Sequence, residues 1–225
     1  MKAIILYGPP GSGKGTQAEL LARKGGSIHF DTGQFIERLV HSPEALHNPI
    51  LTREKKLFDA GILCTPSWVL STIKNATKKI AKAGYNVVYS GSPRTLFEAF
   101  GDKKNRGLIY ELNALYGKKN VVIIHLKIAT ATCATRNAAR FICSVCGLPR
   151  LAGGTPASHC VFCGGKLMKR TLDDPKVIVT RMKEYETRTA PIFNQLKKEG
   201  YSIHNVDGNT APYKVMEKIE KALKE

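Results

Sequence analysis

The sequence predicts an α/β fold in which helices cover both faces of a parallel sheet. Five short apolar segments are expected to be strands, and segments with helical spacing of apolar residues separate them. Strands that alternate with helices are typical of a parallel sheet, because each crossover usually contains a helix. A Gly-, Pro- and Cys-rich stretch interrupts this alternation. The expected strands are Lys2–Tyr7, Ser27–Phe30, Asn86–Ser90, Val121–Lys127 and Ser202–Val206.

The helices expected between these strands follow from apolar spacing and from residues that begin or end helices. Lys14–Lys24 carries its apolar residues on one face. The helix after Thr65 begins with a threonine N-cap and a proline in its first turn, and Gly84 ends it. Further helices are expected over Gly33–His41, Pro49–Ala60, Leu108–Leu115, Thr130–Phe141, roughly Pro175–Glu199 and Ala211–Leu223.

Composition indicates a globular protein and excludes several other classes. Of the 225 residues, 43% are hydrophobic and 24% are charged, which argues against general disorder. The longest purely apolar runs, Ala3–Leu6 and Val121–Ile124, are far too short to span a membrane. The apolar stretch after Lys2 is too short for a signal peptide, so we expect a cytoplasmic protein.

The formal net charge of +17 favours anionic partners, which include nucleic acid, membrane surfaces and phosphate compounds. Most of the lysines lie on helix-like stretches, and we interpret them as solvated helix faces. Nucleic acid binding is therefore not expected from the charge alone. No seam for self-association is evident, so a monomer is expected.

The glycine-rich segment Gly8–Thr16 has the spacing of a P-loop and lies between a predicted strand and a predicted helix. Glycines let successive backbone N–H groups converge on a phosphate, and the helix N-terminus adds a positive dipole end. Lys14 would reach the terminal phosphates. A serine or threonine usually follows this lysine and binds Mg²⁺, but here Gly15 precedes Thr16. We therefore expect Mg²⁺ to be held mainly through phosphates and water.

Four of the six cysteines form two Cys-x-x-Cys pairs. This spacing predicts a tetrahedral zinc site, and four thiolates leave no open position, so the zinc would be structural. His159 is a weaker alternative ligand. Cys64 and Cys133 stand alone in apolar surroundings and are expected to be buried. The expected ligands are Cys143, Cys146, Cys160 and Cys163.

These motifs, in this order, resemble those of adenylate kinases and other nucleoside monophosphate kinases. The resemblance covers essentially the whole chain. It rests on Gly8–Gln17, on Asp31-Thr32-Gly33 for the family's Ser-Thr-Gly, on Asp59–Leu63, on Gly91–Thr95 for its Gly-Phe-Pro-Arg segment, on the pair Arg136 and Arg140, and on Arg170 and Arg181 with Tyr185, Thr189 and Pro191.

The resemblance implies a P-loop kinase fold with a five-stranded parallel sheet and two inserted lobes. The implied core comprises residues 1–32, 69–139 and 175–225. Residues 33–68 would form the monophosphate-binding lobe, and residues 140–174 would form a zinc-containing lid.

The implied reaction moves the terminal phosphoryl group of ATP, with Mg²⁺, to a nucleoside monophosphate, most simply AMP. Such a transfer needs cations that stay charged and bind phosphate bidentately, which favours arginine. The resemblance implies a phosphate cage of Lys14, Arg94, Arg136, Arg140, Arg170 and Arg181; an ATP site of Gly8, Gly11, Ser12, Gly13, Lys14, Gly15, Thr16 and Arg136; and a monophosphate site of Thr32, Gly33, Ile62, Cys64, Arg94, Glu98, Arg170 and Arg181.

Four positions depart from the family pattern. Ser90 replaces an aspartate that helps to hold hydrated Mg²⁺, and Glu37 replaces an arginine that contacts the monophosphate. Glu98 replaces a glutamine that reads the acceptor adenine, and Leu172 replaces the first of two lid aspartates. These changes leave two alternatives open: a kinase that prefers another monophosphate such as GMP, and a degenerate kinase that binds nucleotide or nucleic acid with little turnover.

Overall fold

The computed structural model describes residues 1–150 and 158–224 and contains a five-stranded parallel sheet, as the sequence predicted. Its strands lie in the order β2-β3-β1-β4-β8. A smaller antiparallel sheet has the order β6-β5-β7. The bounds are β1 Ala3–Tyr7, β2 Ile28–Asp31, β3 Val87–Ser90, β4 Val121–Lys127, β5 Phe141–Cys143, β6 Pro149–Arg150, β7 Leu167–Met168 and β8 Ile203–Asp207.

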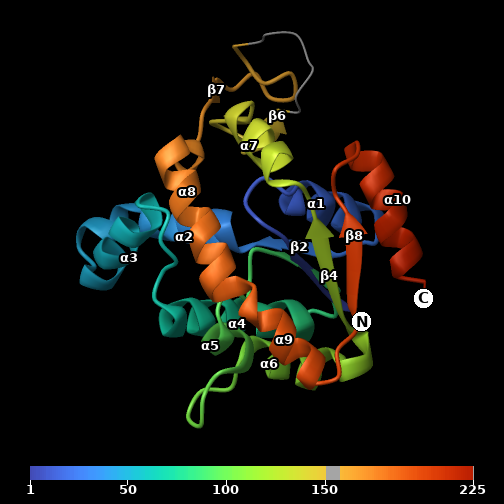
Figure 1. Ribbon diagram of the computed structural model, residues 1–225. Coiled ribbons are helices and arrows are strands. Elements are labelled where there is room, and N and C mark those ends of the chain that lie inside the picture. The colour runs from blue at the N-terminus through green and yellow to red at the C-terminus, as the bar shows by residue number, and fades with distance from the viewer. Residues whose placement is uncertain (151–157, 225) are drawn as a thin grey trace.

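Helices cover both faces of the large sheet (Figure 1). Along β1, Ile5 packs into one apolar cluster and Ile4 into a second, because successive strand side chains point to opposite faces. The first cluster is covered by α4 (Pro66–Lys82), α6 (Leu108–Tyr116) and α9 (Pro191–Lys198), and the second by α1 (Lys14–Lys24) and α10 (Pro212–Ala222).

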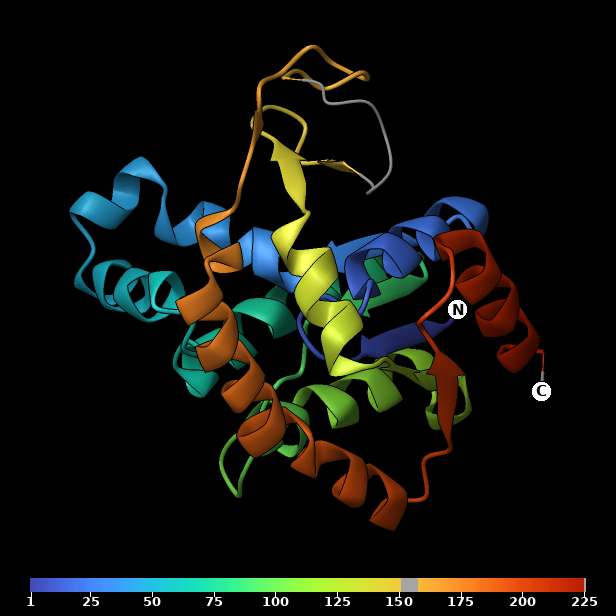
Figure 2. The ribbon, with the colours of Figure 1, turned by 45° about the horizontal axis from the view of Figure 1, so that its top comes forward.

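Two smaller units project from this core (Figures 1 and 2). Helices α2 (Thr32–Val40) and α3 (Pro49–Asp59), with a 3₁₀ turn at Pro43–Leu46, extend to one side. The antiparallel sheet β5–β7 lies at the top, between α7 (Thr130–Ala138) and α8 (Pro175–Glu184). A short helix that the sequence did not predict, α5 (Leu96–Phe100), follows β3.

The helix predicted over Thr130–Phe141 is shorter than expected. Helix α7 ends at Ala138, and Phe141 begins strand β5, where it pairs with Arg150. Phe141 and Ile142 extend the apolar spacing of the helix in the sequence, but they belong to strand β5, where they are half-buried in the small sheet. Pairing between residues distant in the sequence therefore overrides the local helical pattern here.

The long helix predicted over Pro175–Glu199 is interrupted. It consists of α8, a π-helical segment at Tyr185–Thr189, and α9. The N–H of Ala190 bonds to the carbonyl of Tyr185 at 2.8 Å, one residue further back than in an α-helix. Pro191 has no N–H to donate, and its ring clashes with an α-helical carbonyl, which favours such a bulge at this place.

Within the described residues, we find no helix that is both long enough and apolar enough to cross a membrane.

Candidate active site

The glycine-rich loop connects β1 to α1 at the carboxyl end of the sheet, as predicted. Gly11 has φ +86° and Gly13 has φ +88°, a left-handed backbone that glycine adopts without strain. A Cβ at Gly11 would lie 2.7 Å from the carbonyl oxygen of Cys133, so only glycine fits there. The ATP-site residues predicted within Gly8–Thr16 therefore form one cradle at the start of α1.

The ammonium of Lys14 lies inside this loop. Its Nζ donates hydrogen bonds to the carbonyl oxygens of Gly8 at 2.6 Å and Pro9 at 2.9 Å. Burial, with the nearby charges of Arg94 and Arg181, lowers the pKa of Lys14 to about 7. An anionic phosphate beside the ammonium would stabilise the charged form and raise this pKa.

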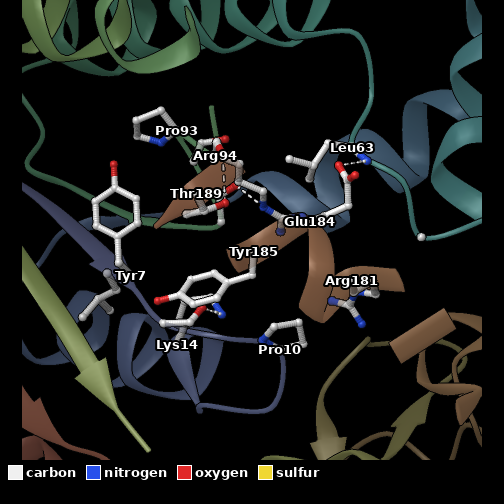
Figure 3. Close-up of a pocket in the computed structure, with 15 residues that line it drawn as sticks. Tyr7, Pro10, Lys14, Leu63, Pro93, Arg94, Arg181, Glu184, Tyr185 and Thr189 are labelled. Atoms are coloured by element: carbon white, nitrogen blue, oxygen red, sulfur yellow. Dashed lines mark hydrogen bonds between the residues drawn. The ribbon is translucent and has the colours of Figure 1, made fainter. Parts of the chain in front are cut away.

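Lys14, Arg94 and Arg181 line a first cavity between the loop and α8, which opens to solvent and has about 490 Å³ of empty space when the solvent at its mouth is included (Figure 3). Burial and the charge of Arg170 lower the pKa of Arg94. Burial, followed by the charges of Arg94, Arg170 and Arg140, lowers the pKa of Arg181 to about 9. Cations that destabilise one another in a partly enclosed cavity make it a favourable site for a polyanion.

A buried carboxylate orients two of these arginines. The guanidinium of Arg140 bonds both oxygens of Asp173, through Nε at 2.7 Å and through Nη2. Arg181 Nη1 donates to the carbonyl of Leu172 at 2.9 Å and lies 3.7 Å from Asp173. Leu172, which stands where the resemblance implies an aspartate, is an apolar buried residue. Asp173 is therefore the acid that holds the arginines here.

Three arginines of the predicted cage, Arg136, Arg140 and Arg170, do not line the first cavity. Arg136 donates to the carbonyl of Thr210 at 3.2 Å, and its Nη1 lies 4.0 Å from the place of a Cβ at Gly13. Arg170 Nη2 donates to Glu37 at 2.8 Å and so joins the region after the lid to α2. Three guanidinium groups of the arginine cage that the sequence predicted are therefore already paired with acids: Arg170 with Glu37, and Arg140 and Arg181 with Asp173.

A second cavity, of about 370 Å³, adjoins the first. Gly91, Ser92 and Arg94 line both cavities. The hydroxyls of Ser92 and Thr32 are buried, and within the described part of the chain they have no hydrogen-bond partner. Six residues predicted for the monophosphate line this cavity, namely Thr32, Gly33, Ile62, Cys64, Arg94 and Glu98, beside apolar Ile36, Phe58, Leu63 and Val69; Arg170 and Arg181 do not line it.

Glu98 is buried in the wall of this second cavity and lies in the first turn of α5, whose N-cap is Thr95. Its Oε2 accepts from the N–H of Arg94 at 2.7 Å, and its Oε1 accepts from the hydroxyl of Thr95 at 3.2 Å. The same hydroxyl accepts from the N–H of Glu98 at 3.1 Å. Burial raises the pKa of Glu98 to about 7, although the hydrogen bond from Arg94 opposes the rise.

Ser90 takes part in a hydrogen-bonded array that the sequence did not predict. Its Oγ lies 2.8 Å from His29 Nε2, and His29 Nδ1 lies 2.9 Å from Glu19 Oε2. An ionised carboxylate only accepts hydrogen bonds, so Nδ1 carries the proton in this array. Ser90 therefore bonds to His29, on the side of the sheet covered by α1.

Several side chains of the first cavity were not assigned to the site from sequence. Glu184 Oε2 accepts from the N–H of Leu63 at 3.1 Å, and the Thr189 hydroxyl donates to the carbonyl of Arg94 at 2.9 Å (Figure 3). The π-helical segment carries Tyr185 and Thr189 into this position. Tyr7 also lines this cavity. Its apolar strand context gave no reason to assign it to the site, and only its position directly before the glycine loop could have indicated that role.

The four predicted cysteine ligands form a compact cluster in the small sheet and its turns. Their sulfurs all lie within 4.8 Å of one another, with Cys143–Cys163 at 3.4 Å and Cys146–Cys160 at 3.8 Å. Tetrahedral zinc with Zn–S bonds of about 2.3 Å requires S–S separations of about 3.8 Å, so the arrangement fits zinc. His159 bonds to Ser158 at 2.7 Å and is not part of the cluster. Cys64 and Cys133 are buried, as predicted.

Comparisons with known proteins agree with this geometry. Residues 6–201 match the family model described as adenylate kinase. The chain is 31% identical to an adenylate kinase of Methanothrix thermoacetophila, with 98% of this chain and 97% of that protein covered. It is 29% identical to one of Pelobacter propionicus (98% and 96% covered) and 31% identical to one of Paramagnetospirillum magneticum (91% and 90%). The chain therefore belongs to the adenylate kinase family and is a nucleoside monophosphate kinase.

Proposed function

We propose that the protein transfers the terminal phosphoryl group of ATP to AMP and forms two molecules of ADP. The observation that carries this proposal is the pair of adjoining cavities, one beside the glycine loop and one with apolar walls. Arg94 lines both, so one guanidinium is available to phosphates entering from either side. Two nucleotides bound in this way would present their phosphates to each other.

The proposed chemistry depends on positioning and electrostatic stabilisation. The loop amides and Lys14 would hold the ATP phosphates, with Arg136 at the edge of the loop. Arg94, Arg140, Arg170 and Arg181 would stabilise the charge on the transferring group and on the acceptor phosphate. An oxygen of the monophosphate attacks in line, so no covalent enzyme intermediate and no general base are needed. A closed lid excludes water and so suppresses ATP hydrolysis.

The proposal includes two metal ions with different roles. Zinc on the four cysteines would order a lid that has few apolar residues of its own. Mg²⁺ would accompany ATP and neutralise part of its phosphate charge. The side chains around the loop fit a hard cation, because Thr16 and Asp31 offer oxygen donors close to α1. We propose a cytoplasmic monomer with the lobe boundaries expected from the sequence.

The choice of acceptor base depends on Glu98, which lines the second cavity. Adenine offers a hydrogen-bond donor at N6 and an acceptor at N1, whereas guanine offers donors at N1 and N2. A carboxylate only accepts and suits guanine, but a protonated carboxyl group both donates and accepts and suits adenine. The raised pKa of Glu98 makes the neutral form available near neutral pH, which supports AMP.

The test is a screen of AMP, GMP, CMP and UMP as acceptors with ATP·Mg²⁺, with ADP formation measured in a coupled assay. We expect AMP to give the highest kcat/KM, with a smaller margin over GMP than an intact glutamine would give. A tenfold preference for GMP would overturn AMP as the substrate and leave the kinase class standing.

The degenerate-kinase alternative makes a different prediction in the same screen. It expects little ADP with any acceptor, together with a shift of nucleic acid in an electrophoretic assay at physiological salt. The observation that favours the degenerate-kinase alternative is the ion pair between Glu37 and Arg170, because it engages a guanidinium that the phosphates would need.

A further inference from the structure

Asp31 presents an unused carboxylate oxygen to the phosphate loop. It ends β2 and caps α2, where its Oδ1 accepts from the N–H of Gln34 at 3.1 Å. Its Oδ2 lies 3.8 Å from the place that a Cβ would take at Gly15, in the first turn of α1. Within residues 1–150 and 158–224, no hydrogen bond or ion pair reaches Oδ2.

Other carboxylates near the two cavities are already engaged. Glu184 accepts from Leu63 and pairs with Arg188 at 3.1 Å. Asp173 is held by Arg140, and both oxygens of Glu98 accept hydrogen bonds from Arg94 and Thr95 at the start of α5. Both bonds of Glu184 reach Oε2, so within the described residues Glu184, like Asp31, keeps one oxygen without a hydrogen bond or ion pair. Asp31 differs from Asp173 and Glu98 in having such an oxygen, and from Glu184 in presenting it beside Gly15 of the phosphate loop.

Asp31 and Ser90 are neighbours across the sheet. They are paired in register at the ends of the parallel strands β2 and β3, so both lie at the carboxyl edge beside the loop. The Ser90 hydroxyl is bonded to His29, and that array continues to Glu19. The resemblance described above implies a serine at the place of Asp31 and an aspartate at the place of Ser90, so relative to that expectation the hydroxyl and the carboxylate stand on each other's strand.

We propose that Asp31, in place of Ser90, is the residue that orients the water shell of the magnesium ion carried by ATP. Magnesium keeps several of its waters in nucleotide sites and is bound through one or two carboxylates together with phosphates. A carboxylate one strand away from the expected position still faces the first turn of α1, where the phosphates bind. Asp31 is a positioning residue in this inference, which rests on the proposed function.

The test compares nucleotide affinity with and without the metal. Calorimetry measures the Kd of a nonhydrolysable β,γ-imido ATP analogue in Mg²⁺ and in EDTA, and the Kd in EDTA divided by the Kd in Mg²⁺ reports the coupling to Mg²⁺. Asp31→Asn should lower this ratio by about tenfold. The variant should bind the magnesium complex more weakly, because an acceptor for metal-bound water is lost. It should bind the metal-free analogue more tightly, because a negative charge is removed.

Asn is itself a good N-cap, so this variant keeps the capping bond to α2 and the fold. Ser90→Ala and Glu19→Gln serve as matched controls on the neighbouring array, and each should leave the ratio within twofold of the wild type. An unchanged ratio in Asp31→Asn, or an equal loss in Ser90→Ala, overturns the proposal.

The acceptor screen separates this inference from the proposed function. If the wild type forms ADP normally and the ratio is insensitive to Asp31, the proposed function stands and the role of Asp31 is wrong. If no acceptor is phosphorylated, the proposed function is wrong, and the binding ratio still decides whether Asp31 faces the metal.

Discussion

Two regions at the same edge of the sheet differ in the partners of their charged groups. The loop region is the phosphate loop Gly8–Thr16, and the acceptor region is the second cavity with the adjoining helices α2 and α5. Lys14 bonds to main-chain carbonyls of its own loop. In the acceptor region, Glu37 pairs with Arg170, and Glu98 accepts from the backbone and hydroxyl that begin α5. The loop site therefore depends on backbone conformation, whereas the acceptor site depends on side chains whose pairing a single substitution changes.

This contrast indicates where function is robust and where it varies. A cradle of backbone N–H groups survives most side-chain changes, provided that its glycines remain. A base pocket with a few polar groups changes its preference when one of them changes from donor to acceptor, an effect worth roughly 1–3 kcal/mol. We therefore expect the largest effects of mutation on the loop side and smaller, selective effects on the acceptor side.

The largest expected effect is at Lys14. Lys14→Met keeps the alkyl stem but removes the charge beside the transferring phosphoryl group. Turnover should fall by about a hundredfold or more, as for other preorganised electrostatic contacts. Steady-state kinetics measure the change, with circular dichroism as a check on folding. Lys24→Met, at the exposed end of the same helix, is the matched control and should keep wild-type turnover. A Lys14→Met enzyme with nearly normal kcat would remove the loop cation from the mechanism.

The cysteine cluster tests whether the lid needs its metal. Elemental analysis should find one zinc per chain, and Cys146→Ser should lose it. Melting temperature should fall by several degrees, because each kcal/mol corresponds to about 2–4 °C in a chain of this size. Turnover should also fall as the lid loosens. His159→Ala should retain the zinc, since this side chain lies outside the cluster. Metal-free protein of undiminished stability would contradict the prediction.

Glu98 should make the choice of acceptor depend on pH. With a pKa of about 7, its carboxyl group is mostly protonated below pH 7 and mostly ionised above it. The ratio of kcat/KM for AMP to that for GMP should therefore fall by about tenfold from pH 6 to pH 8. The ratio is the useful quantity, because Lys14 titrates in the same range and affects both substrates alike.

Several groups face Glu98 and enter this profile. Arg94 and Arg188 favour its ionised form, while Tyr7 and Cys64 lie close enough for its charge to raise their pKa values. Glu98→Gln removes the titrating group and should give a flat ratio that favours AMP. A variant that retains the wild-type slope would assign the pH dependence to another group.

The smallest expected effect concerns Glu37. Glu37→Gln should release Arg170 for the acceptor phosphate and lower the KM for the monophosphate by about threefold, with little change in kcat. The effect is small because a partly exposed ion pair is worth no more than about 1 kcal/mol. Initial rates against monophosphate concentration give both constants. Glu44→Gln, on the exposed turn of the same lobe, is the control. A raised KM in Glu37→Gln would mean that the ion pair supports the acceptor site.

Features with a local signature were predictable from the sequence. The strands and most helices follow from apolar spacing, and the glycine loop is encoded in nine consecutive residues, Gly8–Thr16. The two Cys-x-x-Cys turns are equally local, and they predicted the cluster. The end of α7 and the bulge before α9 were missed, because pairing in the small sheet and the position of Pro191 override the apolar period.

What the sequence determined by itself is the class of the protein: a parallel α/β fold, a phosphate loop, a cysteine cluster and a set of spaced arginines. The tertiary structure decided which charges meet. It paired Glu37 with Arg170 and bonded both oxygens of Glu98 to the residues just before α5. It placed Asp31 beside Ser90, with one oxygen that no hydrogen bond or ion pair reaches within the described part of the chain. The physical reason is that electrostatic interactions and hydrogen bonds depend on distances between residues far apart in the chain, whereas hydrophobic periodicity and glycine conformation are read within a few residues.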